Sequence, residues 1–365
     1  MPTVLAEVEW EACPLEPHRD AELESYVRRT YGALPSSVAY FTPVPWLVRS
    51  MPALSVVGAP PLHFDTVLAD LIGLVVSQDN SCRYCFGMQR LLLRVRGIPE
   101  AHIRELEQNY LEAEIDPRTK AALDFARRLS RAAPRVGALD LAEVRDAGWS
   151  PDAIRELAFQ SAYCVYMNRL MTISAIPFAR AERLATSRLV RWFAPLWRWR
   201  LQRRLQTSRE SALLSDGGAD DAPWSSLVKA LSGTNCARPL RETLDAAFAS
   251  PVLSRRAKAL IFAVVARGLD CRLSEREALG VLSETGLDAG EIESILTHLA
   301  SPRLDELESG LLPFARGTIR GSPAQLQQRT PALAAKYGEA RTVEAIGIAA
   351  LANAVCRLGA VTELG

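Results

Sequence analysis

Two cysteines three residues apart are the part of this sequence whose residue types and spacing could do chemistry. Cys82 and Cys85 follow an apolar segment and a short polar run, and they precede an amphipathic segment. This order predicts a helix, a short loop and a second helix that opens at the cysteines. Thiols three residues apart on a helix share a face and can close a disulfide. The helix N-terminus also favours a thiolate, so the pattern predicts a dithiol/disulfide centre.

Two polar residues stand at spacings that matter for proton transfer to these thiols. Asp70 lies on the preceding predicted helix, twelve residues before Cys82. Gln89 lies four residues after Cys85, one helical turn along and on the same face. We therefore expect an acid and a hydrogen-bonding amide to converge on the cysteine pair.

With these residues the sequence resembles the alkylhydroperoxidase-D-like, or carboxymuconolactone decarboxylase-like, family. Members of its redox branch carry a Glu twelve residues before a Cys-x-x-Cys pair and a His four residues after it. Cys82 and Cys85 match the pair, Asp70 is a shortened acid, and Gln89 stands at the histidine position. The resemblance implies an all-helical fold and a thiol-dependent oxidoreductase of the peroxidase type that needs no bound cofactor or metal.

The resemblance also implies a role for each of these residues. Cys85 attacks a peroxide or disulfide substrate, Cys82 closes the disulfide, and a thiol reductant restores the pair. Asp70 sets the proton balance, and Gln89 orients water or substrate. Glutamine cannot exchange a proton at neutral pH, so the sequence departs from the family at this step.

Other interpretations of the same residues stay open at the level of sequence. The missing histidine favours a non-catalytic scaffold or binding protein whose thiols are inert core residues. Tyr84 either supplies an acidic hydroxyl or simply packs, and His63 either replaces the imidazole or lies in a loop. A zinc site needs about four ligands, which the spacing of the histidines does not provide. A lyase of the decarboxylase branch ranks last, because that branch does not use a cysteine pair.

The second half of the chain repeats the first. Placing Cys82 on Cys271 aligns residues 71–106 with 260–295 without a gap, which indicates an internal duplication. The chemistry is not repeated, because the matching positions of the second cysteine, the acid and the amide hold Ser274, Ala259 and Ala278. We expect this copy to be a structural partner, and we interpret the remaining cysteines as small core residues: Cys13, Cys164, Cys236, Cys271 and Cys356.

The hydrophobic pattern predicts an all-α protein, because no stretch of useful length alternates with period two. We expect two tandem alkylhydroperoxidase-D-like domains that pack as an intrachain pseudo-dimer. The predicted order is an N-terminal arm and helix over residues 1–40, the domain with the cysteine pair over 41–180, a basic, tryptophan-rich connector with an acidic hinge over 181–222, and the degenerate domain over 223–365.

Composition limits the classes of function. A chain of 365 residues with 48% hydrophobic residues can bury two cores, and a net charge of +1 gives no reason to expect a nucleic-acid partner. Seven scattered cysteines and no signal peptide lead us to expect the cytoplasm. We expect no apolar run of the ~18 residues that a membrane span needs. Residues 188–205 suit a membrane surface, but packing against the chain's own domains or in a homo-oligomer is favoured.

Overall fold

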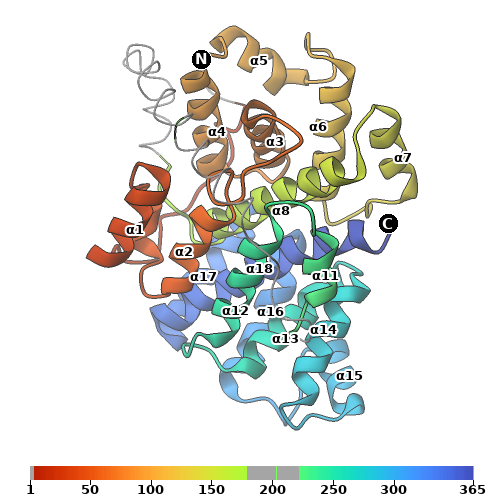
Figure 1. Ribbon diagram of the computed structural model, residues 1–365. Coiled ribbons are helices and arrows are strands. Elements are labelled where there is room, and N and C mark those ends of the chain that lie inside the picture. Colours follow the sequence, from red (N-terminus) through yellow and green to blue (C-terminus); the bar gives the residue numbers. More distant parts are fainter. Residues whose placement is uncertain (1–3, 179–202, 204–221, 365) are drawn as a thin grey trace.

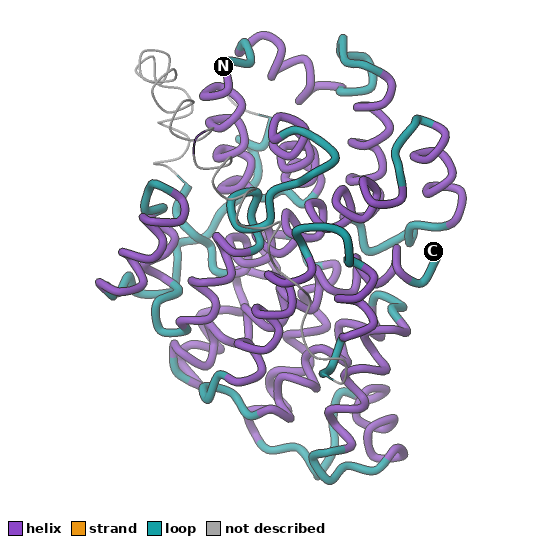
Figure 2. Tube along the Cα trace, viewed as in Figure 1, coloured by secondary structure: helices purple, strands orange, loops and turns teal. Residues whose placement is uncertain are grey.

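The computed structural model describes residues 4–178, 203 and 222–364. Within these residues the chain consists of helices and loops and has no strand (Figure 2). The predicted all-α class is therefore confirmed. The predicted connector lies outside the described residues except for Arg203 and Ala222, and its suggested contact with a membrane surface stays a prediction.

The helices of the first half begin and end at the signals that the sequence carries. Asp20 and Ser150 each accept a backbone N–H as N-caps, while Gly32 and Gly97 end their helices in the left-handed conformation. The elements are α1 (Ala21–Tyr31), a short 3-10 helix (Ser36–Tyr40), α2 (Pro45–Ala53), α3 (Thr66–Asp79), α4 (Arg83–Arg96), α5 (Glu100–Asn109), α6 (Pro117–Ser130), α7 (Ala138–Asp146) and α8 (Pro151–Ile173).

The second half repeats this backbone. With Cys82 placed on Cys271, α13 begins and ends opposite α3, and α15 begins and ends opposite α5. Even the left-handed residue before each cysteine recurs, with φ 53° at Ser81 and 52° at Asp270. The elements are α11 (Ser225–Ala230), α12 (Ala237–Ala249), α13 (Arg255–Gly268), α14 (Arg272–Ser283), α15 (Ala289–His298), α16 (Glu306–Arg320), α17 (Pro323–Tyr337) and α18 (Glu339–Thr362).

The long helices α8 and α18 pack against each other at the centre of the molecule and join its two halves (Figure 1). Within α18, a window of 18 residues reaches a mean hydropathy of 1.6, so the sequence prediction that no run is long and apolar enough for a membrane span was wrong for this helix. The structure buries 94% of that window, as expected of a core helix. The domain identity and pseudo-dimer stay predictions.

Two buried arginines link the halves in a reciprocal way. Arg169 on α8 donates from Nη2 to Ile319 O near the end of α16, at 3.0 Å. Arg357 on α18 donates from Nε to Ser130 O at the end of α6, at 2.8 Å. A helix C-terminus favours a cation, so each half stabilises a helix end of the other. Burial lowers the pKa of Arg169 to about 10 and that of Arg357 to about 9, which leaves both charged at neutral pH.

The N-terminal arm, residues 4–20, contains no helix, and hydrogen bonds hold it against the rest of the chain. Trp10 Nε1 donates to Ile176 O at 3.2 Å, and Glu11 N donates to Gln327 Oε1 at 2.8 Å, so the arm contacts both halves. Val8 O accepts from Arg83 Nη1 at 2.9 Å. The arm therefore passes over the first residue of α4, next to the cysteine pair.

Candidate thiol site

Cys82 is the N-cap of α4, as the sequence order predicts. The left-handed Ser81 turns the chain out of α3, and the Cys82 backbone is extended before the helix begins. Its Sγ accepts the backbone N–H of Cys85 at 3.4 Å. A sulfur in this position satisfies an N–H group that the helix leaves free, which favours negative charge on the sulfur.

The two thiols share their protons unequally. Burial on its own would raise the pKa of Cys82. Hydrogen bonds from the Cys85 thiol and backbone N–H outweigh this effect, and Thr172 and the positive charge of Arg169 contribute as well. The pKa of Cys82 therefore falls below its ordinary value. Burial and the hydrogen bond that it donates raise the pKa of Cys85 well above the ordinary value. The structure therefore favours a Cys82 thiolate beside a protonated Cys85.

The two sulfurs also differ in exposure, and both belong to free cysteines. Cys82 is 0% exposed and Cys85 is 7% exposed. Both residues are thus buried, and Cys85 is the less buried of the two. The lower pKa belongs to the inner residue, Cys82, so attack by a Cys85 thiolate requires that its proton first move to Cys82.

Asp70 does not contact the cysteines directly in this structure. It is buried on α3, and its carboxylate forms an ion pair with Arg96 near the end of α4. Burial raises the pKa of Asp70 to about 6 in spite of the arginine. Burial, with a smaller contribution from the Asp70 charge, raises the pKa of Cys164 on α8 to about 12, so this thiol is neutral at neutral pH and does not carry the Asp70 charge to Cys85.

Gln89 lies on α4 between Cys85 and Arg96, where it packs directly on Gly73 of α3. A Cβ atom at Gly73 would stand only 2.5 Å from Gln89 Cδ, so this contact needs the glycine. Gln89 Oε1 is buried and has no hydrogen-bond partner among the described residues. The Gln89 amide thus packs against α3 with its oxygen unpaired among the described residues, and its contact with the cysteine pair stays a prediction.

The other two candidates from the sequence have structural partners. Tyr84 O–H donates to Ser37 Oγ at 3.1 Å, and burial raises its pKa to about 12, so it holds its proton at neutral pH. His63 Nδ1 lies 3.2 Å from Glu156 Oε2 in the loop before α3. Neither residue takes the place of the family's histidine in this arrangement.

The contribution of α8 to the site was not predicted from the sequence. Arg169, Thr172 and Cys164 act on the thiols from this helix, and Tyr163, which is influenced by the charge of Cys85, donates its O–H to Met51 O at 3.1 Å. These residues are polar positions inside a helix that is buried over most of its length. A polar side chain within a buried helix is the signal that could have identified them.

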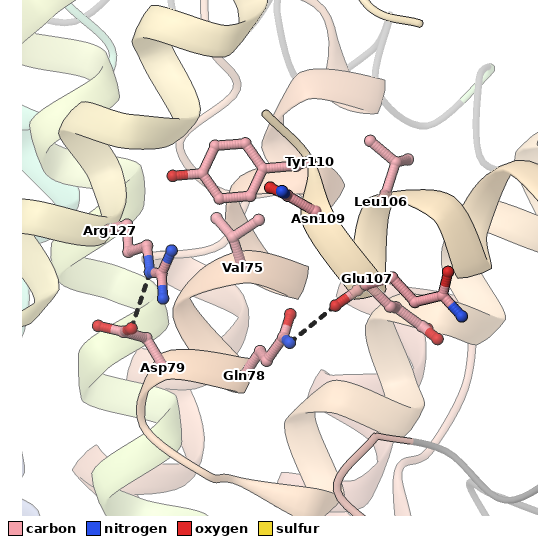
Figure 3. Close-up of a pocket in the computed structure, with 9 residues that line it drawn as sticks. Val75, Gln78, Asp79, Leu106, Glu107, Asn109, Tyr110 and Arg127 are labelled. Carbon is pink, nitrogen blue, oxygen red and sulfur yellow. Dashed lines mark hydrogen bonds and ion pairs between the residues drawn. The ribbon is translucent and has the colours of Figure 1, made fainter. Parts of the chain in front are cut away.

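A cleft of about 310 Å³ lies beside α3, α5 and α6 (Figure 3). Gln78 Nε2 donates to Glu107 O at 2.9 Å and Arg127 Nε donates to Asp79 Oδ1 at 2.8 Å along its wall. Val75, Gln78 and Asp79 line it from the side of α3 opposite to Asp70 and Gly73. Its lining includes neither Cys82 nor Cys85, so this cleft does not open onto the thiols.

The described residues include no group of three or more His, Cys, Asp or Glu side chains arranged to hold a metal ion. Comparisons of the chain with known protein families, with curated proteins and with solved structures found no match. The family resemblance therefore rests on the cysteine pair and its flanking residues alone.

Proposed function

We propose that this protein is a thiol-dependent oxidoreductase that reduces a peroxide or a disulfide through Cys82 and Cys85. The observation that supports it most is the unequal pair itself. Cys82 accepts hydrogen bonds from Cys85 at the start of α4, and Cys85 is the less buried of the two cysteines. An inert pair of core thiols has no need of this arrangement.

With a hydroperoxide as substrate, the reaction balances in atoms and electrons. Cys85 passes its proton to Cys82 along their hydrogen bond, and the Cys85 thiolate attacks the outer peroxide oxygen. The O–O bond breaks, the alcohol leaves with a proton, and Cys85 becomes a sulfenic acid. Cys82 then attacks the Cys85 sulfur, and the hydroxyl group leaves as water. The two thiols lose two electrons, the peroxide gains them, and a thiol reductant later restores the pair.

The resemblance to the alkylhydroperoxidase-D-like family supports this proposal, although Gln89 replaces the histidine that relays protons there. Asp70 offers a partial substitute. Its pKa of about 6 lets it exchange a proton near neutral pH, from its place on α3 beside Arg96.

The test is the count of free thiols before and after one equivalent of hydrogen peroxide, with peptide mass spectrometry to locate the loss. We expect a disulfide between Cys82 and Cys85, and its absence in Cys82→Ser and Cys85→Ser. Cys13→Ser is a matched control, because serine can keep the hydrogen bond that Cys13 donates to Ser174 O. A Cys82–Cys85 peptide that keeps both thiols would contradict the proposal.

A non-catalytic scaffold is the second candidate, and one observation favours it. Cys82 is fully buried, and the arm passes over the start of α4. Under this hypothesis peroxide leaves the Cys82–Cys85 peptide unchanged in the folded chain, and oxidises it only after unfolding. The same thiol measurement with and without denaturant therefore separates the two candidates.

A further inference from the structure

A second pair of cysteines meets in the second half of the molecule, from two helices far apart in the sequence. Cys271 is the N-cap of α14, and Cys356 lies on α18. The Cys356 thiol donates a hydrogen bond to the Cys271 sulfur. The sequence pattern left Cys271 without a thiol partner, so this pair was not predicted.

The close approach depends on a glycine one turn after Cys356. A Cβ atom at Gly359 would stand 2.8 Å from Cys271 Sγ, so the sulfur rests on bare backbone of α18. Since residues three apart share a helix face, Cys356 points to the same sulfur from the neighbouring turn. A disulfide forms only where the two Cβ atoms lie close together, so formation of the disulfide is itself the test of this pair.

Polar groups surround the Cys271 sulfur as well. Ser274 Oγ lies 3.4 Å from it, and Glu363 Oε1 lies 3.9 Å from it. Unlike Cys82, Cys271 accepts no backbone N–H of its helix as an N-cap. Glu363 is 21% exposed and is held by Leu273 N at 2.6 Å and by an ion pair with Arg135. Its carboxylate therefore lies at the boundary between the buried thiol and solvent.

We propose that Cys271 and Cys356 form a second redox-active dithiol centre, which hydroperoxides oxidise to a disulfide that ties α14 to α18. The hydrogen bond from Cys356 lowers the pKa of Cys271 more than burial raises it, while burial and that donated bond raise the pKa of Cys356 well above its ordinary value. Cys271, the sulfur with the lower pKa, is thus the nucleophile and Cys356 the resolving thiol. Both are buried, 0% and 1% exposed, so a peroxide reaches Cys271 only past the Glu363 side chain.

The reaction balances in the same way as at the first pair. The Cys271 thiolate attacks the peroxide, the O–O bond breaks, and the alcohol leaves with a proton. Cys356 then attacks the Cys271 sulfenic acid and loses its proton, and water leaves as the S–S bond forms. Two electrons pass from the thiols to the peroxide.

The experiment uses the full chain with Cys82→Ser and Cys85→Ser, so that its result is independent of the first pair. We expect hydrogen peroxide to remove two thiols per chain, with one Cys271–Cys356 disulfide found by peptide mass spectrometry. Adding Cys356→Ser abolishes that disulfide and leaves a Cys271 sulfenic acid that dimedone traps. Cys236→Ser is the matched control and leaves the disulfide unchanged, because Cys236 is a buried cysteine whose pKa is raised by burial.

Two further measurements keep the test decisive. Disulfide mapping of the unsubstituted chain avoids any effect of the serines on folding. Glu363→Ala removes the side chain between Cys271 and solvent and is expected to speed the oxidation. Retention of both thiols in the unsubstituted chain and in Glu363→Ala, with helical circular dichroism unchanged, would overturn the proposal.

Discussion

The two halves of the molecule place a cysteine at the same point of the same backbone and surround it differently. Cys82 and Cys271 each follow a left-handed residue, begin a helix and have a pKa below the ordinary value. Their thiol partners differ: Cys85 comes from the same helix, whereas Cys356 comes from α18. The repeated backbone thus places a sulfur with a lowered pKa at the start of a helix in each half, while the second thiol comes from a different helix in each.

The central helices show a second difference between the halves. Arg357 donates three hydrogen bonds, to Ser130 O and to two oxygens of Asn353. Arg169 donates one, to Ile319 O. Each arginine also has one buried nitrogen without a partner among the described residues, Nε of Arg169 and Nη2 of Arg357. The two positive charges repel each other, and this repulsion by Arg169 helps to lower the pKa of Arg357. The interface is therefore built from two similar links of unequal strength.

The largest expected effect on stability comes from the different numbers of hydrogen bonds that Arg357 and Arg169 donate. Arg357→Met leaves buried acceptors without a donor, so we expect it to lower the free energy of unfolding by about 4 kcal/mol. Arg169→Met removes one bond and relieves the repulsion, and should cost about half as much. Urea unfolding of both variants gives these values. Arg329→Met is the control, since its bond to Pro313 O is exposed. Equal losses in the two variants would show that the number of hydrogen bonds does not set the strength of each link.

The next prediction concerns the dependence of stability on pH, to which Asp70 in the first half contributes and its matching residue in the second half does not. Asp70 has a pKa of about 6 in the folded chain and an ordinary value of 3.8, whereas Ala259 at the matching position does not titrate. Between these values the folded state binds more protons than the unfolded state, so stability falls as the pH rises. The contribution of Asp70 to the free energy of unfolding is present below about pH 4 and is lost by about pH 6, and the total loss is about 3 kcal/mol.

Asp70→Asn should remove this fall. The measurement is the free energy of unfolding from pH 4 to 7, compared between the variant and the unsubstituted chain. The slope with pH is the relevant quantity, since loss of the Arg96 ion pair also shifts the absolute stability. Asp146→Asn, at an exposed acid, should keep the original slope. If the slope of Asp70→Asn matches that of the original chain, Asp70 is charged throughout this range and the prediction is wrong.

These comparisons also show what the sequence could and could not predict. Helix caps and the repeat are local or regular signals, so the all-α class and the opening of α4 at Cys82 were predicted correctly. Contacts between distant segments carry no such signal. The pairing of Cys271 with Cys356 depends on the absence of a side chain at Gly359. The ion pair between Asp70 and Arg96 depends on how α3 and α4 pack against each other. Nothing in the spacing of residues along the chain encodes either contact.

The smallest expected effect concerns Gln89, which stands where the resemblance to the alkylhydroperoxidase-D-like family places a histidine. Gly73 offers a surface without a side chain opposite residue 89, so an imidazole ring has room there. A histidine has an ordinary pKa of ~6.5 and can accept the proton that Gln89 cannot. We expect Gln89→His to raise the rate of Cys82–Cys85 oxidation by hydrogen peroxide a few-fold, measured by quenched thiol labelling at pH 7.

The second half provides an internal control for this change. Ala278 stands at the matching position there and has no proton to exchange, so the rate of Cys271–Cys356 oxidation should be the same in Gln89→His as in the original chain. Gln89→Met keeps the length of the side chain without its polar atoms, and should not raise either rate. If histidine and methionine alter the first rate equally, residue 89 acts through packing on Gly73 and not through proton transfer.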